Sequence, residues 1–173
     1  MAGPLASVAM VSTFCLAETL SMAGFALVPS LLPHFTQLWS LSATEGGWLG
    51  GIFFLGYILA VPVLVSLTDR IDARRVYLVG ASLSGLALAG FASLADGMAM
   101  GLVCWWLAGL GLAGTYMPGL KALTDRLPVV TQSRGTAFYT ATFGVGAGLS
   151  YLWIGFTQGL LPWRLQFSLA ALC

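Results

Sequence analysis

Charged side chains are scarce in this chain of 173 residues, which has only 7 Lys and Arg and 6 Asp and Glu. They make up 8% of the sequence, whereas a soluble domain carries about 25%. Hydrophobic residues make up 58%, and the mean hydropathy is +0.92. So few charges cannot cover a soluble fold, and disordered chains are poor in apolar residues and rich in charge. The composition therefore predicts a protein that lies mostly in lipid.

Residue types that carry chemistry are scarce as well. The chain has one histidine, His34, and three cysteines without paired spacing, so we expect neither a metal site nor a cofactor. An intramembrane enzyme needs convergent catalytic groups, but every aspartate lies at the end of an apolar block, which argues against an enzyme. A net charge of +1 offers no basic surface to nucleic acid.

The few charges divide the chain into long uncharged blocks. A helix that crosses the hydrocarbon core needs about 20 mostly apolar residues, and each block is long enough to cross once. The blocks lack the apolar and polar alternation of a barrel wall, so we expect an all-α, polytopic membrane protein. The predicted spans lie near residues 8–31, 46–67, 76–95, 98–120 and 136–158.

A sixth hydrophobic stretch, 164–173, is too short to cross a bilayer as a helix. Because it ends on apolar residues without a polar tail, we expect it to be an incomplete sixth span. On this interpretation residues 1–173 are one transmembrane domain and a piece of a longer protein.

The basic residues indicate how the chain is oriented. Arg164 is the one basic residue expected on the outer side, and the others lie in two inner segments that contain Arg70, Arg74, Arg75, Lys121, Arg126 and Arg134. Basic residues favour cytoplasmic loops. We therefore expect a cytoplasmic amino terminus in the plasma membrane, or in the inner membrane of a bacterium.

Glycines recur at a spacing of four residues in two spans. Helices in lipid associate by close backbone approach at small residues, so we expect these glycines to pack helices together, with a dedicated dimer face as the alternative. The pairs are Gly46/Gly50, Gly47/Gly51, Gly144/Gly148 and Gly155/Gly159.

The segment 65–75 resembles the signature loop between the second and third helices of the major facilitator superfamily, roughly Gly-x-x-x-Asp-Arg-x-Gly-Arg-Arg. Asp69, Arg70 and Arg74 match that pattern, whereas Val65 replaces its Gly and Asp72-Ala73 replaces its Gly-Arg pair. The resemblance implies that Asp69, Arg70, Arg74 and Arg75 form a conformational latch between the two halves of a transporter.

Two further segments are similar to the same superfamily. Residues 111–118, with 127–128 and 133–135, look like its fourth helix and the following loop, and Trp163-Arg164-Leu165-Gln166-Phe167 looks like the start of its sixth helix. The resemblance implies an amino-terminal six-helix half-bundle of a twelve-helix carrier, which moves a small solute by alternating access. Trp106 stands close to where proton-coupled drug exporters carry an Arg, and the substrate is not assigned.

Glu18 is the one acid in the interior of a predicted span. It would lie near the middle of the bilayer, where burial favours its protonated form. We expect it to face the transport cavity and to bind a proton or a cationic group of the substrate. The alternative is a protonated Glu18 that is hydrogen-bonded between helices. Candidate cavity-lining residues are Trp106, Tyr116, Lys121 and Tyr139.

The partners expected from the sequence are the lipid bilayer, a small-molecule substrate and the missing carboxy-terminal half, or a second copy of this chain. Half of such a carrier is not expected to transport alone, because the cavity forms between two halves. The alternative function is therefore a non-transporting membrane subunit, or a fragment with a structural or interaction role.

Overall fold

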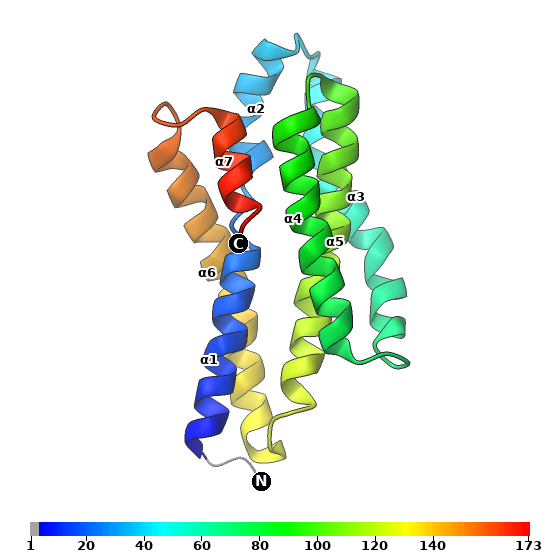
Figure 1. The fold of residues 1–173 in the computed structure, drawn as a ribbon, viewed down its shortest axis with the longest axis vertical. Helices are drawn as coiled ribbons and strands as arrows, with labels where there is room; N and C mark the ends of the chain where they lie inside the picture. The colour runs from blue at the N-terminus through cyan, green and yellow to red at the C-terminus, as the bar shows by residue number, and fades with distance from the viewer. Residues whose placement is uncertain (1–3) are drawn as a thin grey trace.

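The computed structural model describes residues 4–173, which form seven helices and no strand (Figure 1). This confirms the all-α prediction. The helices are α1 (Pro4–Ser21), α2 (Leu27–Leu38), α3 (Ala43–Leu67), α4 (Ala73–Leu94), α5 (Met98–Thr124), α6 (Val129–Thr157) and α7 (Trp163–Ala170).

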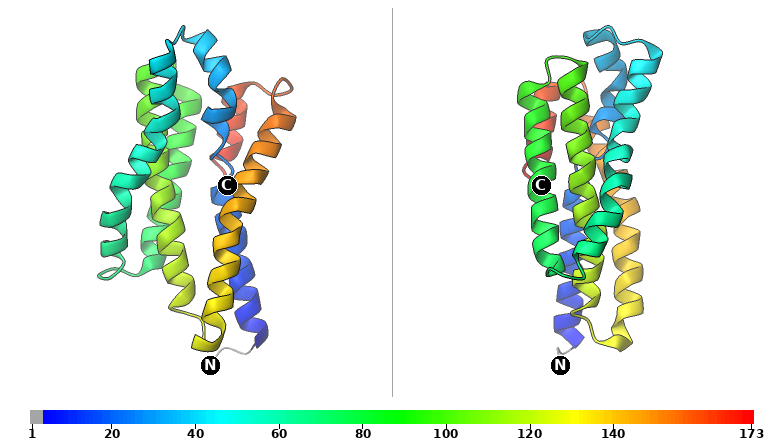
Figure 2. Two further views of the ribbon diagram at one scale, coloured as in Figure 1. Left: turned by 180° about the vertical axis from the view of Figure 1, so that it is seen from behind. Right: turned by 90° about the vertical axis from the view of Figure 1, so that its right-hand side faces the viewer.

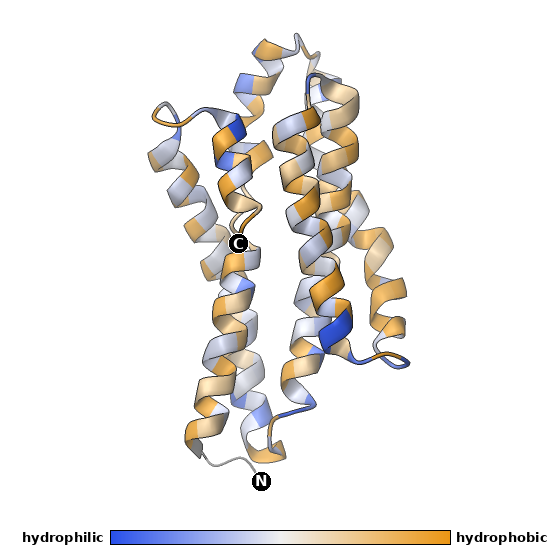
Figure 3. Ribbon diagram, viewed as in Figure 1, coloured by the Kyte–Doolittle hydropathy of each residue, from blue (hydrophilic) through white to orange (hydrophobic). Residues whose placement is uncertain are grey.

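Three helices, α3, α4 and α5, are individually long and apolar enough to cross a membrane. α6 has 29 residues, but its many glycines and threonines lower its hydropathy. Figure 3 shows apolar residues along every helix, and strongly hydrophilic residues at the start of α4 and in the loop after α5. The chain is therefore a multi-pass membrane protein.

The first predicted span, 8–31, is not one continuous helix. α1 ends at Ser21 and α2 begins at Leu27, with a turn between them. Ser150 of α6 satisfies two backbone groups of this turn. Its Oγ accepts a hydrogen bond from the Ala26 N–H at 3.0 Å and donates one to the Ala23 carbonyl at 2.8 Å. Hydropathy alone does not predict such a break, because the residues of the turn are as apolar as those of the helices around it.

The loops alternate between the two ends of the bundle (Figures 1 and 2). Residues 68–72 and 125–128 lie at the end where α1 begins, and residues 39–42, 95–97 and 158–162 lie at the opposite end. The turn 22–26 lies between the two ends. The two basic segments therefore share one end of the molecule, as their charge predicts.

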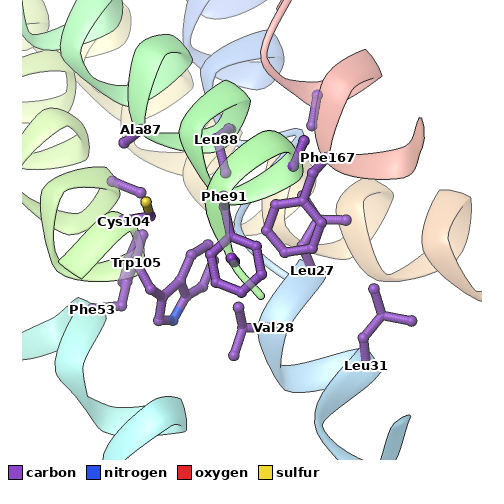
Figure 4. Close-up of a cluster of buried hydrophobic side chains, with 14 of the residues drawn as sticks. Leu27, Val28, Leu31, Phe53, Ala87, Leu88, Phe91, Cys104, Trp105 and Phe167 are labelled. Atoms are coloured by element: carbon purple, nitrogen blue, oxygen red, sulfur yellow. The ribbon is translucent and has the colours of Figure 1, made fainter. Parts of the chain in front are cut away.

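An aromatic core fills the end opposite those basic loops (Figure 4). Phe167 of α7 stacks on Phe91 of α4 with ring centroids 4.2 Å apart, and Trp105 of α5 packs beside them. Arg164 anchors the start of α7, because its guanidinium donates to the Ala92 carbonyl at 2.6 Å and pairs with Asp96 at 2.7 Å. Short α7 is thus held against α4 by stacking and by an ion pair.

Glycines bring α5 into backbone contact with α3 and α4. A Cβ on Gly80 of α4 would lie 2.7 Å from the Gly114 Cα, and a Cβ on Gly109 would collide with the Phe53 carbonyl of α3. The predicted glycine pairs behave differently. Within residues 4–173 a Cβ would meet nothing within 4 Å at Gly47, Gly50, Gly51, Gly144, Gly148 or Gly155.

Within residues 4–173 the packing prediction was therefore wrong for those six glycines and for Gly159, and the alternative of a dimer face stays a prediction. The six lie on helix faces that contact no other part of the described chain, and residue spacing does not reveal which face of a helix turns inward.

This difference between glycines predicts opposite effects of one substitution. Gly109→Ala should lower the free energy of unfolding by about 1–3 kcal/mol, because the added methyl group overpacks the α3–α5 contact. Gly47→Ala is the matched control. It should leave stability unchanged or raise it by up to about 1 kcal/mol, since Ala has the better helix propensity. Thermal unfolding in detergent checks both, and equal losses would contradict the assigned packing.

Candidate functional site

Glu18 lies in the last turn of α1, one turn before the break in the first span. Its side chain is 0% exposed, although it belongs to the most strongly hydrated class of residues. Ser21 completes the local structure, because its hydroxyl donates to the Glu18 backbone carbonyl at 2.9 Å. The carboxyl group therefore lies inside the bundle and is not in contact with lipid.

Tyr139 of α6 is the hydrogen-bond partner of this carboxyl group. Its Oη lies 3.0 Å from Glu18 Oε2 and 3.1 Å from the backbone carbonyl oxygen of Tyr116 in α5. Tyr139 is itself fully buried. Gly119 of α5 leaves room for the hydroxyl, because a Cβ there would collide with Tyr139 Oη. One hydroxyl group thus links α1, α5 and α6.

Four tyrosines from four helices lie in the region of Glu18, and we call them the tyrosine cluster. Tyr116 stacks on Tyr139 with ring centroids 5.8 Å apart. Tyr77 of α4 faces Gly119 beside the Tyr139 hydroxyl, and Tyr57 of α3 lines a cavity together with Tyr116. The chain has five tyrosines, so most of them gather around its one buried acid.

A positive charge is missing from this cluster. Glu18 takes part in none of the ion pairs found between residues 4 and 173, and its Oε1 has no hydrogen-bond partner there. Lys121, the basic residue of α5, pairs with Asp69 and Asp125. A buried carboxylate without a cation is costly, so this environment favours either a protonated Glu18 or a cation that enters from outside.

A cavity of about 190 Å³ adjoins the tyrosine cluster. Its lining is aromatic and aliphatic, and consists of Phe25, Phe53, Phe54, Tyr57, Leu112, Tyr116 and Phe143. Phe25 comes from the break between α1 and α2, so the break contributes directly to the cavity wall. Tyr57 and Tyr116 belong to both the cavity and the cluster.

The structure separates the residues that we expected in this cavity. Tyr116 lines it, whereas Trp106 packs against α3, where a Cβ on Gly56 would collide with its carbonyl oxygen. Tyr139 is hydrogen-bonded to Glu18 and does not line the cavity. Lys121 pairs with Asp69, at the end of the bundle that holds the loop 68–72. Glu18 is not part of the lining either.

Phe25, Phe53 and Phe54 line the cavity but were not predicted, because the sequence does not show in which direction an aromatic residue of an apolar span points.

The loop that we expect to form the latch, residues 68–72, is held in place by ion pairs of its two aspartates. Asp69 pairs with Lys121 at 3.8 Å, and Asp72 pairs with Arg126 at 3.3 Å, so the loop between α3 and α4 is tied to the end of α5. Arg70, Arg74 and Arg75 are exposed, and none of them forms an ion pair with a residue that the structure describes.

Asp72 has a local role that the sequence comparison with the signature loop missed. It is the N-cap of α4, and its Oδ1 accepts a hydrogen bond from the Arg74 backbone N–H at 2.8 Å. This bond, together with the hydrogen bond and charge of Arg126, holds the pKa of Asp72 below its usual range. An aspartate directly before a helix is a preferred N-cap, and this signal was present in the sequence.

Metal ligands do not converge anywhere in the described part of the chain: no three His, Cys, Asp or Glu side chains there share a site. The three cysteines are free thiols on separate elements. The chemistry available at the site is therefore that of one carboxyl group and its tyrosines.

Comparison with known families identifies the fold. The family model of the Major Facilitator Superfamily matches residues 14–172. The chain belongs to the major facilitator superfamily. Its α3, α4, α5 and α6 thus correspond to the second to fifth helices of that superfamily, and α1 with α2 corresponds to the first.

Curated members of the superfamily are similar over most of this chain. A probable sphingolipid transporter, spinster homolog 2 of Arabidopsis thaliana, is 27% identical over 128 residues, which are 74% of this chain and 26% of that protein. The niacin transporter NiaP of Acinetobacter baylyi is 25% identical over 146 residues, 84% of this chain and 33% of that protein. The matched part of the chain thus spans between a quarter and a third of these relatives.

The contact between Gly119 and Tyr139 predicts a non-additive pair of substitutions. Gly119→Ala should lower the free energy of unfolding by about 1–3 kcal/mol, because its methyl group displaces the Tyr139 hydroxyl. In a Tyr139→Phe background the same change should cost less by about 1 kcal/mol, since the displaced atom is gone. Denaturant unfolding in detergent measures both.

Gly144→Ala serves as the control, because a Cβ at Gly144 meets no described atom within 4 Å. Its effect should be the same with Tyr or Phe at position 139. An equal cost of Gly119→Ala in the two backgrounds would contradict the placement of the hydroxyl.

Proposed function

We propose that this chain is the amino-terminal helical bundle of a secondary active transporter, which moves a small organic solute by alternating access and is coupled to protons through Glu18. The observation that carries the proposal is a fully buried carboxyl group near the middle of a membrane bundle, without a cation and beside an aromatic cavity. Acids in that position are expensive, and they typically belong to proton or substrate pathways.

A proton fits Glu18 better than a cationic group of the substrate. The carboxyl group is 0% exposed and does not line the cavity, so a solute in the cavity meets Tyr57 and Tyr116 first. A proton can reach the carboxyl group without any cavity large enough for a solute. The carboxyl group is already hydrogen-bonded to the Tyr139 hydroxyl, which can both donate and accept a hydrogen bond.

The cavity suits a solute with an apolar or aromatic body. Its lining has six aromatic rings with one aliphatic neighbour, two of the rings carry hydroxyl groups, and no lining residue is charged. The similar proteins are named for a sphingolipid and for niacin. These two solutes are therefore the first to try in a transport screen.

We propose further that a second helical bundle completes the cavity, because alternating access needs two halves. The loop of Asp69, Arg70, Arg74 and Arg75, in which Asp69 pairs with Lys121, would act as the latch between them, on the cytoplasmic side of a plasma or inner membrane. The reading frame beyond Cys173 tests this arrangement. Further spans would support it, and an immediate stop codon would favour a non-transporting subunit or a pair of identical halves.

No catalytic role is part of this proposal. A carrier needs the carboxyl group only to hold and release a proton, and the binding energy of solute and proton drives the change of state.

Glu18→Gln tests proton coupling in the full-length carrier. In proteoliposomes the ratio of solute uptake with a proton gradient to uptake without one should fall from above 1 to about 1, because an amide cannot exchange a proton. Glu45→Gln is the matched control, since Glu45 lies in an outer capping box with Ser42 that Gln also forms, and it should keep the ratio of the unchanged carrier. Unchanged uptake and unchanged pH dependence in Glu18→Gln would refute the role of Glu18.

A further inference from the structure

The hydroxyl group of Tyr139 has more neighbours than it has protons to donate. Its Oη lies 3.0 Å from Glu18 Oε2, 3.1 Å from the Tyr116 carbonyl oxygen and 3.5 Å from the Thr115 carbonyl oxygen. Backbone carbonyl oxygens only accept, and a tyrosine hydroxyl has one proton to give. The protonation state of Glu18 therefore decides which of these bonds form.

A protonated Glu18 completes the chain of hydrogen bonds. The carboxyl O–H donates to Tyr139 Oη, and Tyr139 then donates its own proton to the Tyr116 carbonyl of α5. An ionised Glu18 only accepts, so the Tyr139 proton turns to the carboxylate and the bond to α5 is lost. Both arrangements use the same heavy-atom positions, and they differ in whether α6 is bonded to α5.

The acceptor on α5 lies at a weak point of that helix. Pro118 is inside α5 and has no N–H, so the carbonyl of Gly114 lacks its helical partner. Tyr116 lies two residues before this proline, and Gly119 directly after it leaves room for the Tyr139 hydroxyl. The hydrogen bond from Tyr139 to the Tyr116 carbonyl therefore forms or breaks at a turn of α5 whose backbone hydrogen bonds are already interrupted by Pro118.

Other titratable groups near Glu18 do not take the place of Tyr139 between the carboxyl group and α5. The cluster presents Tyr57 from α3, Tyr77 from α4 and Tyr116 from α5, and Cys15 lies one turn earlier on α1. A tyrosine hydroxyl or a cysteine thiol with its ordinary pKa is uncharged at neutral pH. Of the four tyrosines, Tyr139 is the one whose hydroxyl is hydrogen-bonded to the carboxyl group in the described structure.

We propose that Tyr139 is the positioning residue that transmits the protonation of Glu18 to α5, by giving its hydroxyl proton to the Tyr116 carbonyl when Glu18 is protonated and to Glu18 when it is ionised. This inference rests on the proposed function of Glu18 as the proton site. It adds a residue that is fully buried and does not line the cavity, and it names the backbone atom on which the proton acts.

The test needs no solute. A fluorinated tag on a cysteine at position 117 of the full-length carrier, with the native cysteines replaced, reports the state of α5 beside Tyr116, because Met117 is exposed. In an otherwise unchanged protein the fluorine resonance should shift with pH. Glu18→Gln should abolish that shift, and Tyr139→Phe should abolish it as well.

Tyr151→Phe is the matched control, since Tyr151 is an exposed tyrosine on the same helix, and the shift should persist there. A shift that persists in Tyr139→Phe but is lost in Glu18→Gln overturns the role of Tyr139 and leaves the proton site standing. A tag that does not titrate in the unchanged protein, or still titrates in Glu18→Gln, overturns both.

A ring-fluorinated tyrosine at position 139 covers the case in which Tyr139→Phe does not fold. Its hydroxyl is a stronger donor and a weaker acceptor, so it stabilises the ionised carboxylate. The midpoint of the tag's titration should then move to lower pH. A midpoint that stays unchanged would mean that Tyr139 only packs against Glu18, and the proposal would be wrong.

Discussion

The hydrogen bond between Glu18 and Tyr139 is the constraint on which the rest of this bundle depends. It joins α1 to α6 inside a membrane protein, at a place where the described chain supplies no positive charge. Without a cation the acid is tolerable only when it is neutral or strongly hydrogen-bonded. The tyrosines around it, the glycine that leaves room for the hydroxyl and the ion pairs that hold Lys121 elsewhere all follow from that requirement.

The break in the first span belongs to the same region. Just beyond Glu18 the backbone leaves the helix, and Ser150 of α6 satisfies the groups that the break exposes. α6 therefore supports the first span through Tyr139 before the break and through Ser150 and Trp153 at the break. Phe25 of the turn reaches the aromatic cavity, so the buried acid and the cavity wall are connected by one short segment of chain.

Much of the fold could be predicted from the sequence, because each charge-free block has to be a helix. Glu18 also stood out, since a lone acid in an apolar span has few explanations. The break at residues 22–26, the partner Tyr139 and the inward glycines could not be predicted. Each depends on which face of a helix meets which neighbour, and spans that are apolar on all sides carry almost no information about their inward face.

Infrared spectroscopy of the full-length protein tests the central claim most directly. A protonated carboxyl group inside a protein has a C=O stretching band that separates it from ionised acids. The account predicts such a band at neutral pH, its absence in Glu18→Gln and its loss as alkali removes the proton. A spectrum at neutral pH without a protonated carboxyl band assignable to Glu18 would contradict the account, because the buried carboxylate would then be ionised without a cation.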